Sequence, residues 1–285
     1  MIKVIGDVIL DRWISGTVER ISQEAPVPIL LEHNEKYSLG GAANVAANLS
    51  NLGADVELYG VASYDVEGHE LRDLLDNHKI KNKLQSHPNQ TTVKTRLVGP
   101  NGQHLLRWDK EENYTSNECV DSLIDTLSKD DIVVVSDYNK GIIQEDTVKR
   151  ILEKTNKIFV DPLQNPEYYR GAYLVKPNMK EYKNWNGTFY PESAVSFMKK
   201  YGWTWLVVTD GGNGIHVLNH NGGYVKYSEP VREVADVSGA GDVVISVIVN
   251  QQYKNNSIPE SCRLACKYAA KSVEKRGICI VDLYE

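Results

Sequence analysis

The stretch Ile132–Asp137 reads IVVVSD, a run of four apolar residues that ends in a serine and an aspartate. A continuous apolar run of this length is typical of a strand buried on both faces of a parallel sheet. The same pattern recurs as IFVDP at 158–162, LVKPN at 174–178 and LVVTD at 206–210. Helical patterns separate these runs. The alternation predicts an α/β fold with a doubly wound, mostly parallel sheet flanked by helices.

The remaining apolar runs extend this prediction along the chain. Strands are expected at 3–5, 56–61, 132–135, 158–160, 173–175 and 206–208, and helices at 42–52, 67–77, 117–127, 145–154 and 191–201. Ligands of doubly wound sheets bind at the carboxyl ends of the strands. Asp137, Asp161, Asn178 and Asp210 follow predicted strands, so we expect them to face a site.

Two regions, 13–36 and 91–108, have short alternating runs with turn signals such as GPNGQ at 99–103. These patterns predict antiparallel hairpins rather than further strand–helix–strand units. The hypothesis is a small β-sheet lid made of segments near 12–37 and 91–108; the alternative is two surface hairpins. An open sheet edge readily pairs with another chain, so a homodimer through the lid sheet is expected.

Composition narrows the class of protein. The chain has 285 residues and a net charge of -6, which argues against a general binder of nucleic acid or anionic membranes. No apolar run reaches about 18 residues, and the first residues carry acidic groups where a signal peptide needs apolar ones, so a cytoplasmic location is expected. Cys119, Cys262, Cys266 and Cys279 form no CxxC pair, which favours free thiols over a metal or redox role.

The stretch DVSGAGDVVIS, Asp236–Ser246, pairs a glycine turn with a carboxylate. Its glycines let the backbone approach a ligand closely, and the apolar residues that follow predict a helix. The N–H groups from Gly239 to Asp242 would then attract an anion. An anion site with a carboxylate at its rim fits phosphoryl transfer, since the carboxylate can accept a hydroxyl proton. The alternative is that Asp242 is only a charge at a helix start.

The stretch SLGGAANVAANLSNLG at 38–53 places two glycines before a helix of small residues. Gly40 and Gly41 leave room for a polyol near the backbone, and Asn44 can donate and accept hydrogen bonds. Small residues also allow close helix packing, so this signal is weak by itself.

The stretch GDVILD at 6–11 carries Asp7 and Asp11 just after the first predicted strand. Carboxylates bind sugar hydroxyls well, because each oxygen accepts two hydrogen bonds. The same pair could instead hold a metal or cap a turn. There is no GxxxxGK[ST] motif, which excludes a P-loop enzyme.

GDxxxD near the N-terminus, GGAxN near residue 40 and GAGD near residue 240 together resemble the ribokinase/PfkB family of carbohydrate kinases. The stretches GDVILDRW, RISQEAPVPIL, LGGAANVAANLSNLGA, TTVKTRL, LLRWD, SDYNKG and DVSGAGD are similar to the branch that phosphorylates D-glycero-D-manno-heptose 7-phosphate. The resemblance implies one ribokinase-like kinase domain over 1–285. It also implies ATP-dependent formation of the 1,7-bisphosphate, at the anomeric hydroxyl, for ADP-heptose and lipopolysaccharide core synthesis. Many members carry a fused nucleotidyltransferase domain, which is not expected here.

The resemblance also implies roles for residues. Asp242 would be the general base, with Gly239, Ala240 and Gly241 as the anion hole. The sugar phosphate would be held by Asp11, Gly40, Gly41, Asn44, Arg96 and Arg107, the two arginines gripping its phosphate from the lid. ATP would be held by Asn178, Thr209, Gly211 and Gly214, with Glu181 ordering Mg²⁺ through water and Asp236 near a monovalent cation, K⁺.

Three positions depart from the family pattern. Leu163 replaces a lysine expected to contact the sugar phosphate, and Lys176, which replaces a neutral residue, is the candidate to compensate. Ser238 stands where threonine is usual and keeps the hydroxyl. Two alternatives therefore stay open: a kinase of another sugar or sugar phosphate, and a non-catalytic binding protein with this fold.

Overall fold

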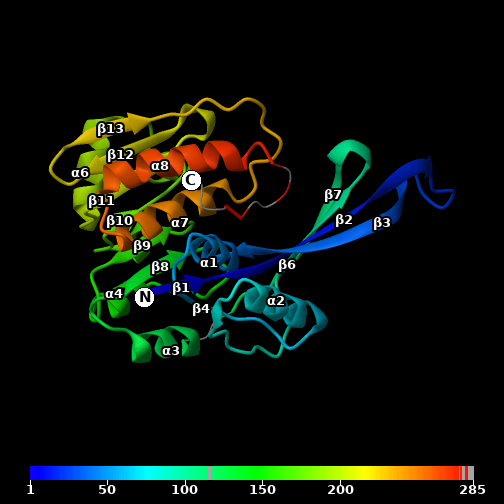
Figure 1. The fold of residues 1–285 in the computed structure, drawn as a ribbon, viewed down its shortest axis with the longest axis horizontal. Helices are drawn as coiled ribbons and strands as arrows, with labels where there is room; N and C mark the ends of the chain where they lie inside the picture. Colours follow the sequence, from blue (N-terminus) through cyan, green and yellow to red (C-terminus); the bar gives the residue numbers. More distant parts are fainter. Residues whose placement is uncertain (115–116, 276, 278–279, 282–285) are drawn as a thin grey trace.

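A computed structural model describes residues 1–114, 117–275, 277 and 280–281 of the chain. The strands of the main sheet are β1 (Ile2–Gly6), β4 (Val56–Tyr59), β5 (Lys81–Asn82), β8 (Ile132–Ser136), β9 (Ile158–Asp161), β10 (Leu174–Val175), β11 (Trp205–Thr209), β12 (Ile215–Asn219) and β13 (Tyr224–Tyr227). In the described residues these nine strands follow the order β13-β12-β11-β10-β9-β8-β1-β4-β5 (Figure 1). Only the β11–β12 and β12–β13 pairs are antiparallel, which confirms the mostly parallel sheet.

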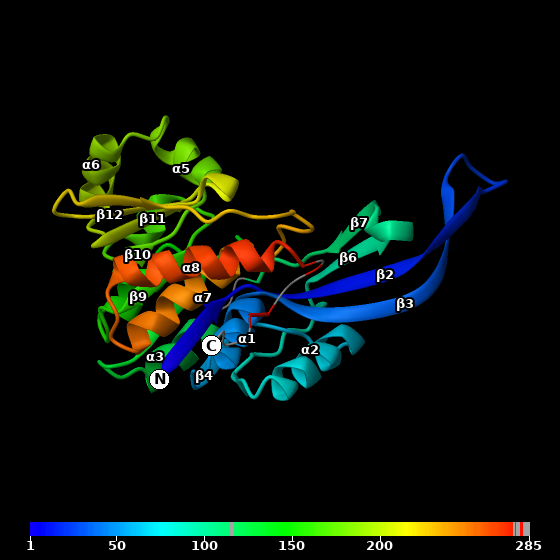
Figure 2. The same ribbon diagram turned by 45° about the horizontal axis from the view of Figure 1, so that its top comes forward.

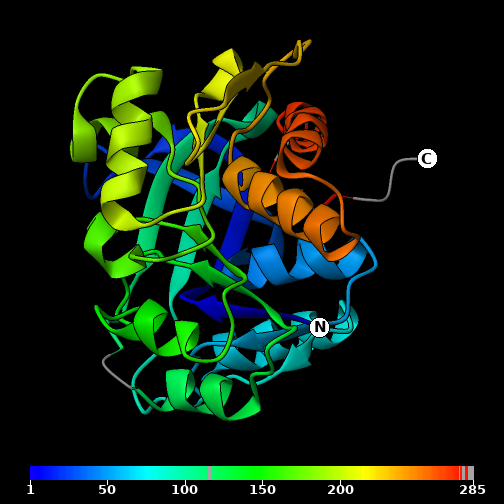
Figure 3. The same ribbon diagram turned by 90° about the vertical axis from the view of Figure 1, so that its left-hand side faces the viewer.

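Helices cover both faces of this sheet. One face packs against α1 (Ala42–Asn51), α2 (Val66–Asn77), α7 (Ala240–Tyr253) and α8 (Ile258–Ser272), the other against α3 (Glu118–Thr126), α4 (Thr147–Leu152), α5 (Met179–Asn186) and α6 (Pro191–Tyr201) (Figure 3). Successive strand residues point to opposite faces of the sheet. Val134 therefore lies in the apolar core between the sheet and the first group of helices, and Val133 and Val135 lie in the core between the sheet and the second group. A strand buried on both sides must be apolar throughout, which is why the continuous runs predicted these strands.

A second sheet projects from the body and is called the small sheet here. Its strands are β2 (Val8–Ile21), β3 (Pro28–Gly41), β6 (Val93–Val98) and β7 (His104–Lys110), in the order β3-β2-β6-β7 within the described residues (Figure 2). Both predicted hairpins are present, since β2–β3 and β6–β7 are antiparallel. The first is longer than predicted, because its pairing continues into the body as far as Val8 and Gly41.

Some boundaries differ from the sequence prediction. The strand expected at 56–61 ends at Tyr59, and the helix expected at 145–154 forms only over Thr147–Leu152. The α5 helix and the β12–β13 edge were not predicted. No helix in the described part of the chain has the length and apolar character needed to cross a bilayer.

The strand order reverses between β1 and β8. From β1 the chain moves to β4 on one side, and it later returns to β8 on the other. Loops leaving the carboxyl ends of two such strands diverge and open a crevice for ligands. Asp7 follows β1 and Asp137 follows β8, so both lie at this crevice.

Candidate active site

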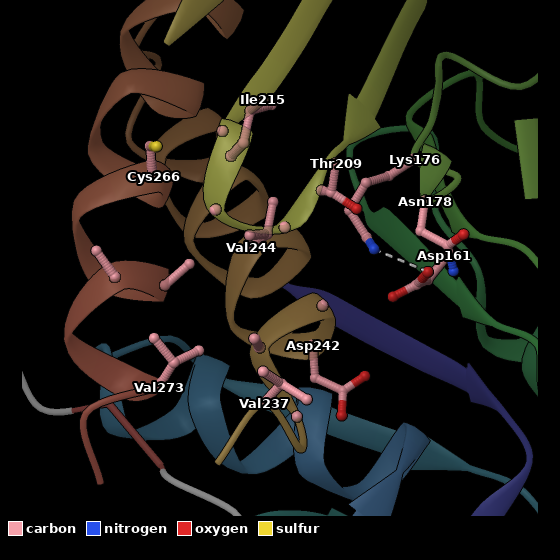
Figure 4. Close-up of a pocket in the computed structure, with 18 of the residues that line it drawn as sticks. Asp161, Lys176, Asn178, Thr209, Ile215, Val237, Asp242, Val244, Cys266 and Val273 are labelled. Carbon is pink, nitrogen blue, oxygen red and sulfur yellow. Dashed lines mark ion pairs between the residues drawn. The ribbon is translucent and has the colours of Figure 1, made fainter. Parts of the chain in front are cut away.

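A cavity of about 540 Å³ opens at the carboxyl ends of β9, β10 and β11, against α7 and α8 (Figure 4). All four residues predicted to hold ATP line this cavity: Asn178, Thr209, Gly211 and Gly214. Glu181 also lines it, as does the turn that starts α7, formed by Gly239, Ala240, Gly241 and Asp242. Its other end is apolar, with Ile215, Val244, Cys266 and Val273. A cavity with one polar and one apolar end suits a ligand that joins an aromatic base to charged groups.

The turn before α7 has the geometry that the glycines predicted. Gly239 caps the helix in the left-handed conformation, with φ 78° and ψ 0°. The N–H groups of the first helical turn have no acceptor within the helix, and the positive end of the helix dipole lies there. Ala240 donates its N–H to the Val237 carbonyl (3.3 Å), which closes the turn. The following N–H groups, those of Gly241 and Asp242, border the cavity and are placed to bind an anion.

The Asp242 side chain is buried and held by one donor on each oxygen. The Asn44 amide donates to Oδ2 (2.6 Å), and the Tyr138 hydroxyl donates to Oδ1 (2.9 Å). Burial raises the pKa of Asp242 to about 7, and the Asp161 carboxylate contributes to the rise. A carboxyl group with a pKa near neutrality is well matched to accept a proton at physiological pH.

Lys176 and Asp161 form an ion pair beside this turn, with 3.0 Å between Nζ and Oδ1 (Figure 4). A Cβ atom added to Gly241 would lie 3.4 Å from Nζ of Lys176. The ammonium group therefore borders the proposed anion hole. Leu163, half-exposed, also lines the cavity, so two of the three positions that depart from the family pattern, Leu163 and Lys176, line it.

The residues predicted to bind the sugar form a second group, on the small sheet and α1. Asp11 of β2 is ion-paired with Arg96 of β6, and both are buried. The Arg96 guanidinium also lies 4.8 Å from the ring centroid of Trp13. A Cβ atom at Gly40 would meet Asp11 Oδ2 at 2.1 Å, so only glycine leaves this carboxylate in place. Burial raises the pKa of Asp11, while Arg96 acts in the opposite direction.

The two arginines predicted to grip a phosphate differ in their surroundings. Arg107 faces Arg96 across the β6–β7 ladder, so the two side chains share one face of the small sheet. Arg96 already has a buried carboxylate partner, whereas the Arg107 side chain is 59% exposed and paired with Asp109 on its own strand (2.9 Å). Arg107 does not line the cavity described above. The structure thus brings Arg96 to Asp11 and leaves Arg107 near the surface.

Gly41 allows a backbone conformation and a close backbone approach that a residue with a Cβ atom would not. Its φ is 57°, and an added Cβ would lie 2.4 Å from the Asp7 carbonyl. It is also the N-cap residue of α1, so it lets the chain turn from β3 into the helix that carries Asn44.

Asn178 and Glu181 form a capping box at the start of α5. The Glu181 N–H donates to Asn178 Oδ1 (2.9 Å), and the Asn178 N–H donates to Glu181 Oε2 (2.7 Å). No group of three or more His, Cys, Asp or Glu side chains that could hold a metal occurs among the described residues. Mg²⁺ binds through few carboxylates, substrate phosphates and water, and the Asp161 and Glu181 carboxylates at the polar end of the cavity fit that mode.

The structure also places Asp236 and three of the four cysteines. The Asp236 carboxylate accepts N–H bonds from Ser238 (2.8 Å) and Gly277 (3.1 Å), which ties the turn before α7 to the end of the chain. Cys119, Cys262 and Cys266 are free thiols, as predicted, and burial raises the pKa of each. Cys279 lies outside the described residues.

Sequence reasoning assigned no role to Tyr138 or Lys94, which both lie at the site. Tyr138 bonds Asp242, and the Lys94 ammonium lies 5.3 Å from the centroid of the Tyr138 ring. Tyr138 directly follows Asp137 at the end of a strand. This position could have identified Tyr138 as a site residue from the sequence, because residues just after a strand of this sheet face the crevice.

Comparisons with known proteins bear on the family and the fold. The family profile described as "pfkB family carbohydrate kinase" matches residues 1–282. The chain is 35% identical to the bifunctional protein HldE of Coxiella burnetii over an alignment of 298 positions, which spans 100% of this chain and 62% of that protein. The fold is similar to phosphofructokinase-2 from Escherichia coli in complex with potassium (TM-score 0.82, 17% identity, 99% and 95% of the two chains) and to ribokinase from Thermotoga maritima (TM-score 0.79, 20% identity, 97% and 94%).

Proposed function

Since this chain belongs to the pfkB family of carbohydrate kinases, we propose that it transfers the γ-phosphoryl group of ATP to a sugar hydroxyl, with Asp242 as the general base. One observation carries the proposal. Asp242 is buried at the start of α7, at the junction between the cavity and the group formed by Asn44, Asp11 and Arg96.

In the proposed reaction the sugar oxygen attacks the γ-phosphorus, and the bond from that phosphorus to the oxygen bridging to the β-phosphate breaks. The hydroxyl proton passes to Asp242, and ADP leaves. The N–H groups of Gly241 and Asp242 and the α7 dipole stabilise negative charge on the phosphoryl oxygens. The raised pKa of Asp242 suits this role, because the group is ionised above pH 7 yet basic enough to take a proton.

For the acceptor we propose D-glycero-D-manno-heptose 7-phosphate, phosphorylated at the anomeric hydroxyl, in ADP-heptose synthesis. The motif resemblance and the HldE relative support this choice. Asp11, oriented by Arg96, would accept hydrogen bonds from sugar hydroxyls, with Gly40 leaving space beside it. Arg107 is the arginine with an exposed guanidinium for the 7-phosphate, provided the small sheet closes as a lid.

Two cations belong to the proposal. Mg²⁺ would neutralise charge on the β- and γ-phosphates, with Asn178 and Glu181 ordering its water shell. K⁺ would bind near Asp236; the similar Escherichia coli phosphofructokinase-2 structure is a complex with potassium.

We also propose a cytoplasmic homodimer formed through the small sheet. Leu106 and Trp108 of β7 are 57% and 60% exposed, and they lie on the face of the sheet opposite Arg107. Large exposed apolar side chains on a projecting sheet favour contact with a second copy.

The test is a coupled assay of ADP release with heptose, hexose and pentose phosphates and with free sugars. Asp242→Asn should lower kcat by roughly 10²–10⁴-fold, the usual contribution of general-base catalysis, with little loss of ATP affinity. The matched control is Asp65→Asn, because Asp65 is the N-cap of α2 and asparagine caps equally well. Turnover by Asp242→Asn near that of the control would refute the base. Strong preference for an unphosphorylated sugar would refute the heptose phosphate assignment.

A further inference from the structure

Tyr138 lies between the cavity and the residues predicted to bind the sugar. It lines the cavity, and its hydroxyl donates to Asp242 Oδ1 (2.9 Å), while the Asn44 amide donates to Oδ2 (2.6 Å). The two donors come from different parts of the fold, since Tyr138 follows β8 and Asn44 lies on α1. Asp242 is thus held from two directions at once.

The loop that carries Tyr138 is fixed by a buried carboxylate. Asp7 Oδ2 accepts the N–H groups of Tyr138 (2.8 Å) and Lys140 (3.0 Å), and Oδ1 accepts that of Ile142 (3.4 Å). Asp7 is 1% exposed. A buried carboxylate that accepts three backbone donors holds a loop firmly, because releasing any of them leaves a buried polar group unpaired. For Asp7 the sequence left open a sugar ligand, a metal ligand or a turn cap, and its contacts match the last of these, because it anchors this loop.

The orientation of a carboxylate base needs such support. Rotation about the last torsion of an aspartate has a broad energy profile, so one contact does not fix the plane of the carboxylate. Its two oxygens together accept about four hydrogen bonds. With one donor on each oxygen, the plane is fixed and free lone pairs remain for the acceptor hydroxyl.

We propose that Tyr138 is a positioning residue for the reaction proposed above: its hydroxyl fixes the orientation in which Asp242 accepts the substrate proton. This inference rests on the proposed function. Tyr138 keeps its own proton for the task, because burial and the Asp242 carboxylate raise its pKa well above the usual range.

Other charged groups also face this pair. Asp161 raises the pKa of Asp242, and Lys176 lowers it. Asp11 acts on Tyr138 from the small sheet, and Lys94 lies over its ring. The hydrogen bond from Tyr138 lowers the pKa of Asp242, so its removal should raise that pKa and move the acid limb of activity to higher pH.

The experiment compares Tyr138→Phe with wild type and with Tyr59→Phe. Tyr59 is the control, because its hydroxyl also donates to a carboxylate, that of Glu57 (2.8 Å), and bonds Thr126 (2.7 Å), away from the cavity. Tyr138→Phe should lower kcat by roughly 10- to 150-fold, the range for losing a hydrogen bond to a charged group, with KM for ATP nearly unchanged. Its acid limb should lie at higher pH than that of wild type, whereas Tyr59→Phe should keep the wild-type limb.

Combining Tyr138→Phe with Asp242→Asn separates this inference from the proposed function. If Tyr138 acts through Asp242, the double variant should be no slower than Asp242→Asn by more than about twofold, because residues acting as a unit are not additive. Full penalties from both changes, or a Tyr138→Phe enzyme with wild-type kcat and acid limb, would overturn the inference while leaving Asp242 as base. Wild-type turnover by Asp242→Asn itself would overturn both.

Discussion

Lys176→Met removes the positive charge that the structure places against the proposed anion hole, beside the Asp161 carboxylate. Nζ lies 3.0 Å from Asp161 Oδ1 and 3.4 Å from the Cβ position of Gly241, and Lys176 is 3% exposed. Methionine keeps the length and apolar stem of the side chain. The substitution therefore tests the ammonium group itself.

The size of the effect follows from these distances. A phosphoryl oxygen bound by the first N–H groups of α7 would lie within hydrogen-bond reach of this ammonium. A hydrogen bond to a charged group contributes about 1.5–3 kcal/mol. At about 1.4 kcal/mol for each tenfold change, kcat should fall by roughly 10- to 150-fold. The pKa of Asp242 should also rise, because Lys176 lowers it, so the loss should be greatest at low pH.

The assay is steady-state kinetics with ATP and the sugar phosphate varied separately. A role at the transferred phosphoryl group predicts a fall in kcat with KM for the sugar phosphate nearly unchanged. The alternative, in which Lys176 replaces the lysine lost at Leu163 and holds the phosphate of the sugar, predicts a large rise in that KM instead.

Lys3→Met is the matched control. Lys3 lies on β1, away from the cavity, is also 3% exposed, and is paired with the carboxylates of Glu57 (3.4 Å) and Asp131 (3.7 Å). Both variants should lose stability by leaving carboxylates unpaired. Only Lys176→Met should lose kcat among molecules that remain folded. Equal kcat losses for the two would refute the argument from geometry.

Three further predictions concern the base, the sugar site and the small sheet. The proposed base Asp242 would have to be ionised to accept a proton, so protonation below its pKa of about 7 should make kcat fall as pH drops through that value; a pH–rate profile flat from pH 5 to 8 would contradict this. Arg96→Ala leaves Asp11 buried without its partner, so the free energy of unfolding in urea should fall by about 3–5 kcal/mol and KM for the sugar phosphate should rise. Arg107 is exposed, so Arg107→Ala should raise the same KM while changing the free energy of unfolding by less than about 1 kcal/mol. Trp108→Glu should convert a dimer to a monomer in sedimentation velocity; a wild-type monomer, or a variant that stays dimeric, would remove the small sheet as the interface.

The sequence predicted the parts of this fold that local pattern encodes. A strand covered on both faces has to be apolar throughout, so runs such as IVVVSD identified the central strands and their carboxyl ends. The glycine turn before Asp242 was equally readable, because the left-handed conformation at Gly239 and the helix after it depend on neighbouring residues. Asn178 and Glu181, predicted to bind ATP and to order Mg²⁺, also form the capping box of α5, a local role that the sequence analysis did not assign.

Tertiary structure alone decided which charges and donors meet. Asn44 and Asp242 are 198 positions apart, Tyr138 and Asp242 are 104 apart, and Arg96 and Asp11 are 85 apart. Each contact depends on the strand order, with β1 beside β8, and on the small sheet's register, neither of which hydrophobic periodicity contains. The sequence therefore supplied the candidate base and the candidate arginines. Only the packed chain decides that Tyr138 and Asn44 meet Asp242. It also decides that Arg96 is paired with buried Asp11 while Arg107 is paired with Asp109 near the surface, because a side chain's partners can be distant in the chain.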